Sequence, residues 1–159
     1  MLEIAMRELT ETEKTELGRR KAQFDAFLEE RMPVLVDFAE NLELPDAPSV
    51  LVEAKAFLSA ISQYMENQRI GPDDRVWIIT RVGYFVGEWF VQMHGGCWFL
   101  NETPDTRYFL RYVVGKFSSI RNQNAMIDPF LIAETFVDSN CPRSLLTLVA
   151  QVESELLNC

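Results

Sequence analysis

The stretch VWIITRVGYFVGEWFVQM, residues 76–93, is the strongest apolar run in the chain. It is close to the length of about 20 residues that crosses a bilayer. However, Arg81 and Glu88 lie well inside it, and each charge costs about 2.5–3.5 kcal/mol near a membrane centre. A helix that is apolar on nearly every side is typical of one that other elements surround. We therefore expect a core helix from about Pro72 to His94, and no membrane span.

Glycines lie within this predicted helix and directly after it. Gly83 and Gly87 remove two side chains from one face, at a cost of about 1 kcal/mol each in helix propensity. We expect another stretch of backbone to approach the helix closely there. The pair Gly95-Gly96 predicts the end of the helix, because glycine adopts positive φ without steric penalty.

The aromatic side chains in and after this helix are predicted to lie in the core rather than in a ligand cage. They are Trp77, Tyr84, Phe85, Trp89, Phe90 and Trp98. Trp and Tyr also dominate the hot spots of binding interfaces. An exposed subset of these side chains would therefore mark a surface for a partner.

A β-hairpin is predicted to follow the helix. A short apolar run, CWFL at 97–100, precedes the turn-rich segment NETPDT at 101–106. The next segment, YFLRYVV at 108–114, is β-branched and aromatic, which favours a strand. Residues 115–128 show no regular pattern, and we expect them to be irregular.

The first predicted helix begins near Thr10, because Thr10 and Glu13 have the spacing of a capping box. Its apolar residues fall mostly on one face and its charged residues fill the other. Proline lacks the N–H that a helix interior needs but is tolerated in a first turn. We therefore expect a break at residues 31–33, with a further helix starting at Pro33.

Three further helices are predicted from proline and capping signals. After the loop LELPDAPS at 42–49, a helix capped by Ser49 should run to about Gln68. A short helix should run from Pro129 to Val137, and Pro142 should open the last one.

The predicted fold class is α+β, mostly α-helical, with about six helices around a buried central helix and one small β-hairpin. The whole chain, residues 1–159, is expected to form a single domain. Its N-terminal helical region, 1–70, would pack on a helix-hairpin-helix core, 71–159. A chain of this length buries about two-thirds of its unfolded surface, so it needs no disulfide or metal for stability.

The charge balance excludes several classes of partner. With 24 acidic and 15 basic residues, the formal net charge is -9. Nucleic-acid binding and adsorption to an anionic membrane both need clustered Lys and Arg, so we expect neither. Acidic residues of the first helix would face solvent or a basic protein partner: Glu11, Glu13, Glu16, Asp25, Glu29 and Glu30.

The cysteines and the N-terminal residues indicate a cytoplasmic location. Cys97, Cys141 and Cys159 are odd in number and far apart, so they suggest a reducing compartment rather than a disulfide framework. Residues 1–14 carry acidic side chains and no apolar core of about 7–15 residues, unlike a secretory signal.

The most distinctive polar motif is the run His94-Gly95-Gly96-Cys97-Trp98. An H-G-G run can belong to an esterase oxyanion hole, but the chain has no G-x-S-x-G nucleophile elbow. A Cys97–His94 dyad is conceivable, although the sequence shows no group to orient the imidazole. His94 and the cysteines also lack the close pairing of zinc ligands. We expect no catalytic residue, no metal and no cofactor, and interpret the run as a helix end followed by a buried strand cysteine.

Glu88 is the other candidate functional residue. A buried carboxylate must be paired or neutral. Arg81 lies two turns earlier on roughly the same face, and Arg107 or Arg111 could reach Glu88 from the hairpin. We expect a structural lock between hairpin and helix, with a general acid or base role as the alternative.

The pattern G-Y-F-V-G-E-W at 83–89, followed by G-G-C-W at 95–98, resembles small bacterial domains of unknown function. In such domains a central helix with this glycine spacing leads into a G-G-x-W strand. Some are encoded near toxins, and immunity or adaptor roles are suspected for them. The resemblance covers about a tenth of the chain and implies no catalytic residues.

Two functions remain as hypotheses. The first is a non-catalytic protein-interaction domain, adaptor or immunity-like, that binds a protein partner or a second copy of itself. The alternative is a small-molecule-binding or hydrolytic domain with a pocket near Glu88, His94 and Cys97. Arg81 and Trp98 complete the set of residues for such a pocket or for a structural lock. A pocket that reaches these side chains would favour the second function, and an exposed apolar groove elsewhere would favour the first.

Overall fold

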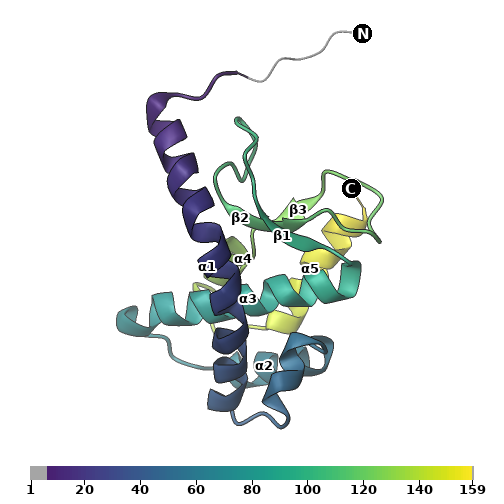
Figure 1. Cartoon of the computed structure of the whole chain (residues 1–159). Helices are drawn as coiled ribbons and strands as arrows, with labels where there is room; N and C mark the ends of the chain where they lie inside the picture. The colour runs from purple at the N-terminus through teal and green to yellow at the C-terminus, as the bar shows by residue number, and fades with distance from the viewer. Residues whose placement is uncertain (1–6, 159) are drawn as a thin grey trace.

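The computed structural model describes residues 7–158, which form an α+β structure that is mostly helical (Figure 1). This confirms the predicted fold class. The α-helices are α1 (Glu11–Asn41), α2 (Lys55–Met65), α3 (Pro72–His94), α4 (Pro129–Val137) and α5 (Leu145–Leu157). The strands are β1 (Cys97–Leu100), β2 (Tyr112–Gly115) and β3 (Met126–Ile127). A short 3₁₀ helix, Ala47–Leu51, lies between α1 and α2.

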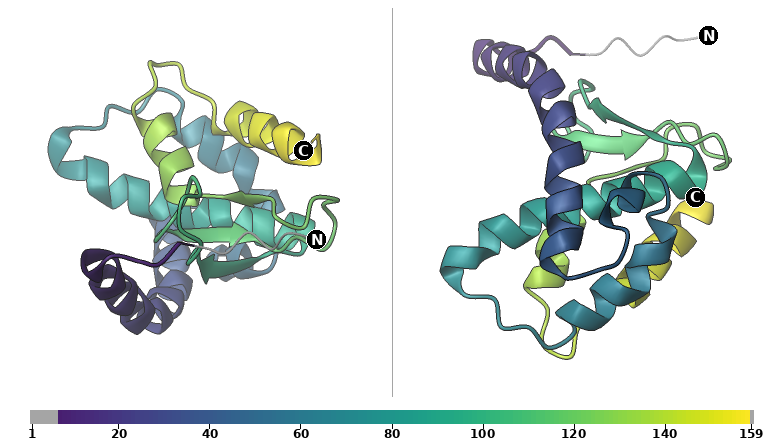
Figure 2. Two further views of the ribbon diagram at one scale, coloured as in Figure 1. Left: turned by 90° about the horizontal axis from the view of Figure 1, so that it is seen from above. Right: turned by 60° about the horizontal axis from the view of Figure 1, so that its bottom comes forward.

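The central helix α3 has the predicted bounds, and Gly95 ends it with a φ of 66°. Every residue from 82 to 90 is buried, and α3 packs against α1, α4, β1 and β2. The prediction that the whole helix is enclosed was wrong. Its first turns extend past α1 (Figures 1 and 2), so Val76 is 71% exposed and Trp77 is 42% exposed. No helix in residues 7–158 combines the length and hydropathy of a membrane span.

The two glycines of α3 accommodate aromatic rings, not the backbone that we expected. A Cβ atom at Gly83 would lie 2.7 Å from Cε1 of Phe130, and one at Gly87 would lie 2.9 Å from Cε2 of Trp98. Both distances are far below the carbon–carbon contact distance of about 3.5–4.0 Å. The absence of a side chain at Gly83 therefore lets α4 pack closely on α3, and its absence at Gly87 lets the sheet do the same.

The sheet has three antiparallel strands in the order β1-β2-β3, so the single-hairpin prediction was incomplete. Trp98 pairs with Val114, which in turn pairs with Ile127. The third strand lies in the segment expected to be irregular, and two residues are too few to show a strand period. Strand β2 begins only at Tyr112, because Leu110 adopts a φ of 64° that interrupts the extended backbone before it.

Helix α1 begins at the predicted capping box. The Glu13 N–H donates to Thr10 Oγ1 (3.1 Å), and the Thr10 N–H donates to Glu13 Oε1 (2.9 Å). The predicted break at residues 31–33 was wrong, since α1 continues through Pro33 to Asn41. Buried side chains after Pro33, including Leu35 and Phe38, keep the last turns of α1 packed on the core.

Two predicted helix starts were displaced. Ser49 does not cap a long helix, because its hydroxyl donates to Asp46 within the 3₁₀ helix, and α2 begins only at Lys55. The last helix, α5, begins three residues after Pro142, where the Ser144 hydroxyl accepts the N–H of Thr147 (3.1 Å). Helix α4 has the predicted bounds, with the Asp128 carboxylate as its cap.

Candidate functional site

Glu88 is 4% exposed and lies where α1, α3 and β1 meet. Its Oε1 atom lies 2.7 Å from Nη1 of Arg31, and it also accepts the indole N–H of Trp98 at 3.3 Å. The predicted link from helix to strand therefore runs through Trp98. The charged partner is Arg31 of α1, which the sequence analysis missed. Arg31 continues the apolar stripe of α1 that contains Phe27 and Leu35, and a charge on such a stripe is the signal that could have identified it.

None of the three arginines proposed for Glu88 pairs with it. The Arg81 guanidinium stacks on Trp77, 3.8 Å from the ring centre, and donates to the Trp77 carbonyl oxygen (3.2 Å). Burial lowers the pKa of Arg81, against the opposing effect of nearby α1 carboxylates. Arg111 Nε lies 2.8 Å from Asp128 Oδ2, and Arg107 stacks on Tyr108.

His94 joins three segments that are far apart in the sequence. Its Nδ1 atom lies 2.9 Å from Ser119 Oγ, and its Nε2 atom lies 2.7 Å from Glu153 Oε2 on α5. Ser119 Oγ also donates to the His94 carbonyl oxygen at 3.2 Å. We call Ser119, His94 and Glu153 the His94 cluster. A hydroxyl, an imidazole and a carboxylate in this order resemble the groups that activate a serine nucleophile.

Cys97 does not belong to the His94 cluster. Its thiol is exposed, and among the described residues it makes no hydrogen bond to His94. The interpretation of Cys97 as a buried strand cysteine was therefore wrong. Successive side chains of a strand point to opposite faces. In β1, Trp98 and Leu100 lie on the buried face, so Cys97 lies on the exposed face.

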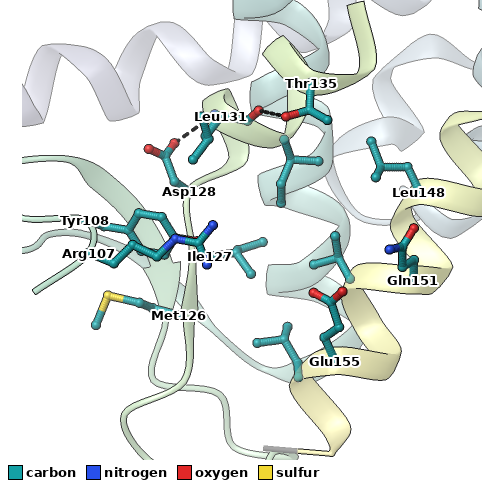
Figure 3. A pocket seen from close by; sticks show the side chains of 13 residues that line it. Arg107, Tyr108, Met126, Ile127, Asp128, Leu131, Thr135, Leu148, Gln151 and Glu155 are labelled. Atoms are coloured by element: carbon teal, nitrogen blue, oxygen red, sulfur yellow. Dashed lines mark hydrogen bonds between the residues drawn. The ribbon is translucent and has the colours of Figure 1, made fainter. Parts of the chain in front are cut away.

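One hollow in the surface lies elsewhere, between α4, α5 and the sheet (Figure 3). We call it the α4–α5 groove. It has a volume of about 470 Å³. Its apolar lining comes from β3, α4 and α5: Met126, Ile127, Leu131, Ile132, Leu148, Val152 and Leu156. Neither Glu88, His94 nor Cys97 lines it. The pocket predicted near Glu88, His94 and Cys97 is therefore not this groove.

Polar groups stand at the edge of the α4–α5 groove. Figure 3 shows the Arg107 guanidinium on the sheet side of the groove and the Glu155 carboxylate on the α5 side, with Gln151 also on α5. Within residues 7–158, neither charge takes part in an ion pair. The sequence gives no signal for this groove, because its walls come from segments that meet only in the folded chain.

A second exposed feature is the start of α3. Val76 and Trp77 are exposed there, next to Asp73 and Asp74 of the first turn. We call these four residues the Trp77 patch. On the opposite flank, Arg75 binds Asp138 of α4 at 2.7 Å, which holds this end of the helix in place.

Comparison with protein-family models, curated proteins and solved structures found no match. The resemblance of residues 83–98 to small bacterial domains stays a prediction. In residues 7–158, no three His, Cys, Asp or Glu side chains gather as metal ligands would, and Cys159 lies outside this range.

Proposed function

We propose that this protein is a non-catalytic protein-interaction domain that binds its partner through the Trp77 patch. The observation that carries the proposal is the exposure of Trp77, at 42%, at a projecting end of the central helix. Tryptophan is enriched among the few residues that supply most of the binding energy of an interface. A large aromatic ring that the fold leaves exposed is therefore a suitable anchor.

The surroundings of Trp77 support this role. Arg81 lies against the ring, 3.8 Å from its centre, and so reduces the side-chain freedom that would be lost on binding. Val76, 71% exposed, extends the apolar area.

The charge at this site specifies the kind of partner. Asp73 and Asp74 adjoin the exposed apolar side chains, and the whole chain has a net charge of -9. Complementary charges speed association and select the partner. The proposed partner is a basic protein with an apolar pocket, and the proposed role of this chain is that of an adaptor or an immunity-like protein.

Affinity capture from the native host tests the proposal. The wild-type protein and a Trp77→Ala variant serve as baits, with Val52→Ala as the control because Val52 is 74% exposed on a different segment. We expect one partner to bind the wild-type and control baits and to be lost from Trp77→Ala. Equal capture of that partner by all three baits would contradict the proposed surface. If the captured partner is this same chain, the protein is a homo-oligomer rather than an adaptor.

The His94 cluster favours hydrolysis as a second candidate function. In such a reaction the Ser119 hydroxyl would turn from the His94 carbonyl oxygen to His94 Nδ1 and pass its proton there while Oγ attacks an ester carbonyl carbon. The alcohol would leave with that proton. Water would then hydrolyse the acyl-serine, which releases the acid and restores the hydroxyl. Turnover of p-nitrophenyl acetate tests this candidate. Activity that Ser119→Ala and Glu153→Gln both abolish would support it, and equal activity in these variants and the wild-type protein would exclude it.

A further inference from the structure

We propose that the α4–α5 groove binds a zwitterionic ligand with an aliphatic side chain, of the amino-acid or dipeptide class. The groove shares no residue with the Trp77 patch or with the His94 cluster. The inference therefore stands independently of the proposed function.

The apolar lining of the groove accounts for the aliphatic part of the ligand. Helix α4 packs on α3, and α5 packs on α2. Leu131 and Ile132 on one wall and Leu148 and Val152 on the other remain only partly buried. A volume of about 470 Å³ lies within the range of small-molecule sites, about 300–1,000 Å³. An aliphatic side chain would bury these surfaces and gain about 25 cal/mol for each Å² removed from water.

The two charges account for the ends of the ligand. Arg107 is held over the Tyr108 ring, 5.1 Å from its centre, and presents a guanidinium that suits a carboxylate. Glu155, on the opposite wall, presents a carboxylate that suits an ammonium group. Gln151, one helical turn before Glu155, offers a further hydrogen bond.

A ligand with only one of these charges fits less well. A fatty acid would leave Glu155 without a partner. An alkyl amine would leave Arg107 without a partner. A zwitterion provides a partner for both residues, because its carboxylate can pair with Arg107 and its ammonium group with Glu155.

Titration of the full chain with L-leucine and with L-leucyl-L-leucine tests the proposal, with binding measured by calorimetry and by methyl NMR shifts. Two analogues serve as ligand controls: 4-methylpentanoate, which lacks the ammonium group, and 3-methylbutylamine, which lacks the carboxylate. The test variants are Arg107→Gln and Glu155→Gln. The matched variants are Arg121→Gln and Glu66→Gln, at exposed residues outside the groove.

We expect at least one zwitterion to bind and to shift the methyl signals of Leu148 and Val152. Each test variant should weaken binding about tenfold, the usual effect of losing a charge-assisted hydrogen bond. The matched variants should stay within about twofold, because exposed charges outside the site contribute little. Binding of neither zwitterion, equal binding of the single-charge analogues, or equal effects of test and matched variants would overturn the proposal.

Discussion

Replacing Gly87 with alanine should destabilise the protein, although glycine to alanine is normally a favourable change inside a helix. Gly87 lies in the buried part of α3, where the Trp98 indole occupies the space that a Cβ would fill. An added Cβ would overlap Cζ2 and Cη2 of Trp98 and lie 2.9 Å from Cε2. The ring cannot easily move away. Its N–H donates to Glu88, and it packs against Phe27 with the ring centres 5.2 Å apart.

The size of the effect follows from two opposing contributions. Overpacking a core costs about 1–3 kcal/mol, and the overlap with several atoms of a fixed ring places Gly87→Ala near the upper end. The gain in helix propensity returns about 1 kcal/mol. We expect a net loss of about 2 kcal/mol, and for a chain of 159 residues this lowers Tm by about 4–8 °C.

Thermal and urea unfolding of Gly87→Ala measure this loss, with Gly18→Ala as the matched control. Gly18 lies in α1, and a Cβ there would have no atom within 4 Å, so the control should be stabilised by about 0.5–1 kcal/mol. In a Trp98→Leu background the cost of Gly87→Ala should largely disappear, because the clashing ring is gone. An unchanged or higher Tm for Gly87→Ala alone would refute this account of the packing.

Three further predictions concern single side chains. Glu88→Gln should lower the free energy of unfolding by about 2 kcal/mol, less than for a fully buried pair because Arg31 is partly exposed; urea unfolding that matches the wild type would exclude the lock. The Arg7 hydrogen bond lowers the pKa of Glu13 from 4.5 to about 2. The ionised Glu13 carboxylate therefore stabilises the fold fully above pH 4.5, and this contribution is lost as the pH falls toward 2. The free energy of unfolding should fall less steeply across this range for Glu13→Gln than for the wild-type protein. Burial raises the pKa of Tyr84 from 10.0 to about 12. The neutral Tyr84 phenol therefore stabilises the fold fully below pH 10, and this contribution is lost as the pH rises toward 12. Alkaline absorbance titration should show one tyrosine ionising late, and Tyr84→Phe should remove that step.

The candidate sites show which interactions could be predicted from the sequence. The burial of Glu88 and its connection to the hairpin followed from a carboxylate on an apolar helix. The position of Arg31 on the apolar stripe of α1 marked it as a residue that needs a partner, but not as the partner of Glu88, because that pairing depends on how α1 crosses α3, 57 residues further along the chain. The links from His94 to Ser119 and Glu153 were missed for the same reason.

Local signals by themselves determined the bounds of α3 and α4, the left-handed turn at Gly95 and the capping box of α1. Each of these depends on backbone sterics or on hydrogen bonds within a few residues. Only the tertiary structure decided that Trp77 stays exposed, that β3 completes the sheet and that a groove opens between α4 and α5. Whether a side chain is buried depends on which distant segments pack over it. An apolar pattern predicts that a helix face is buried, but it does not show how far along the helix the covering segments extend.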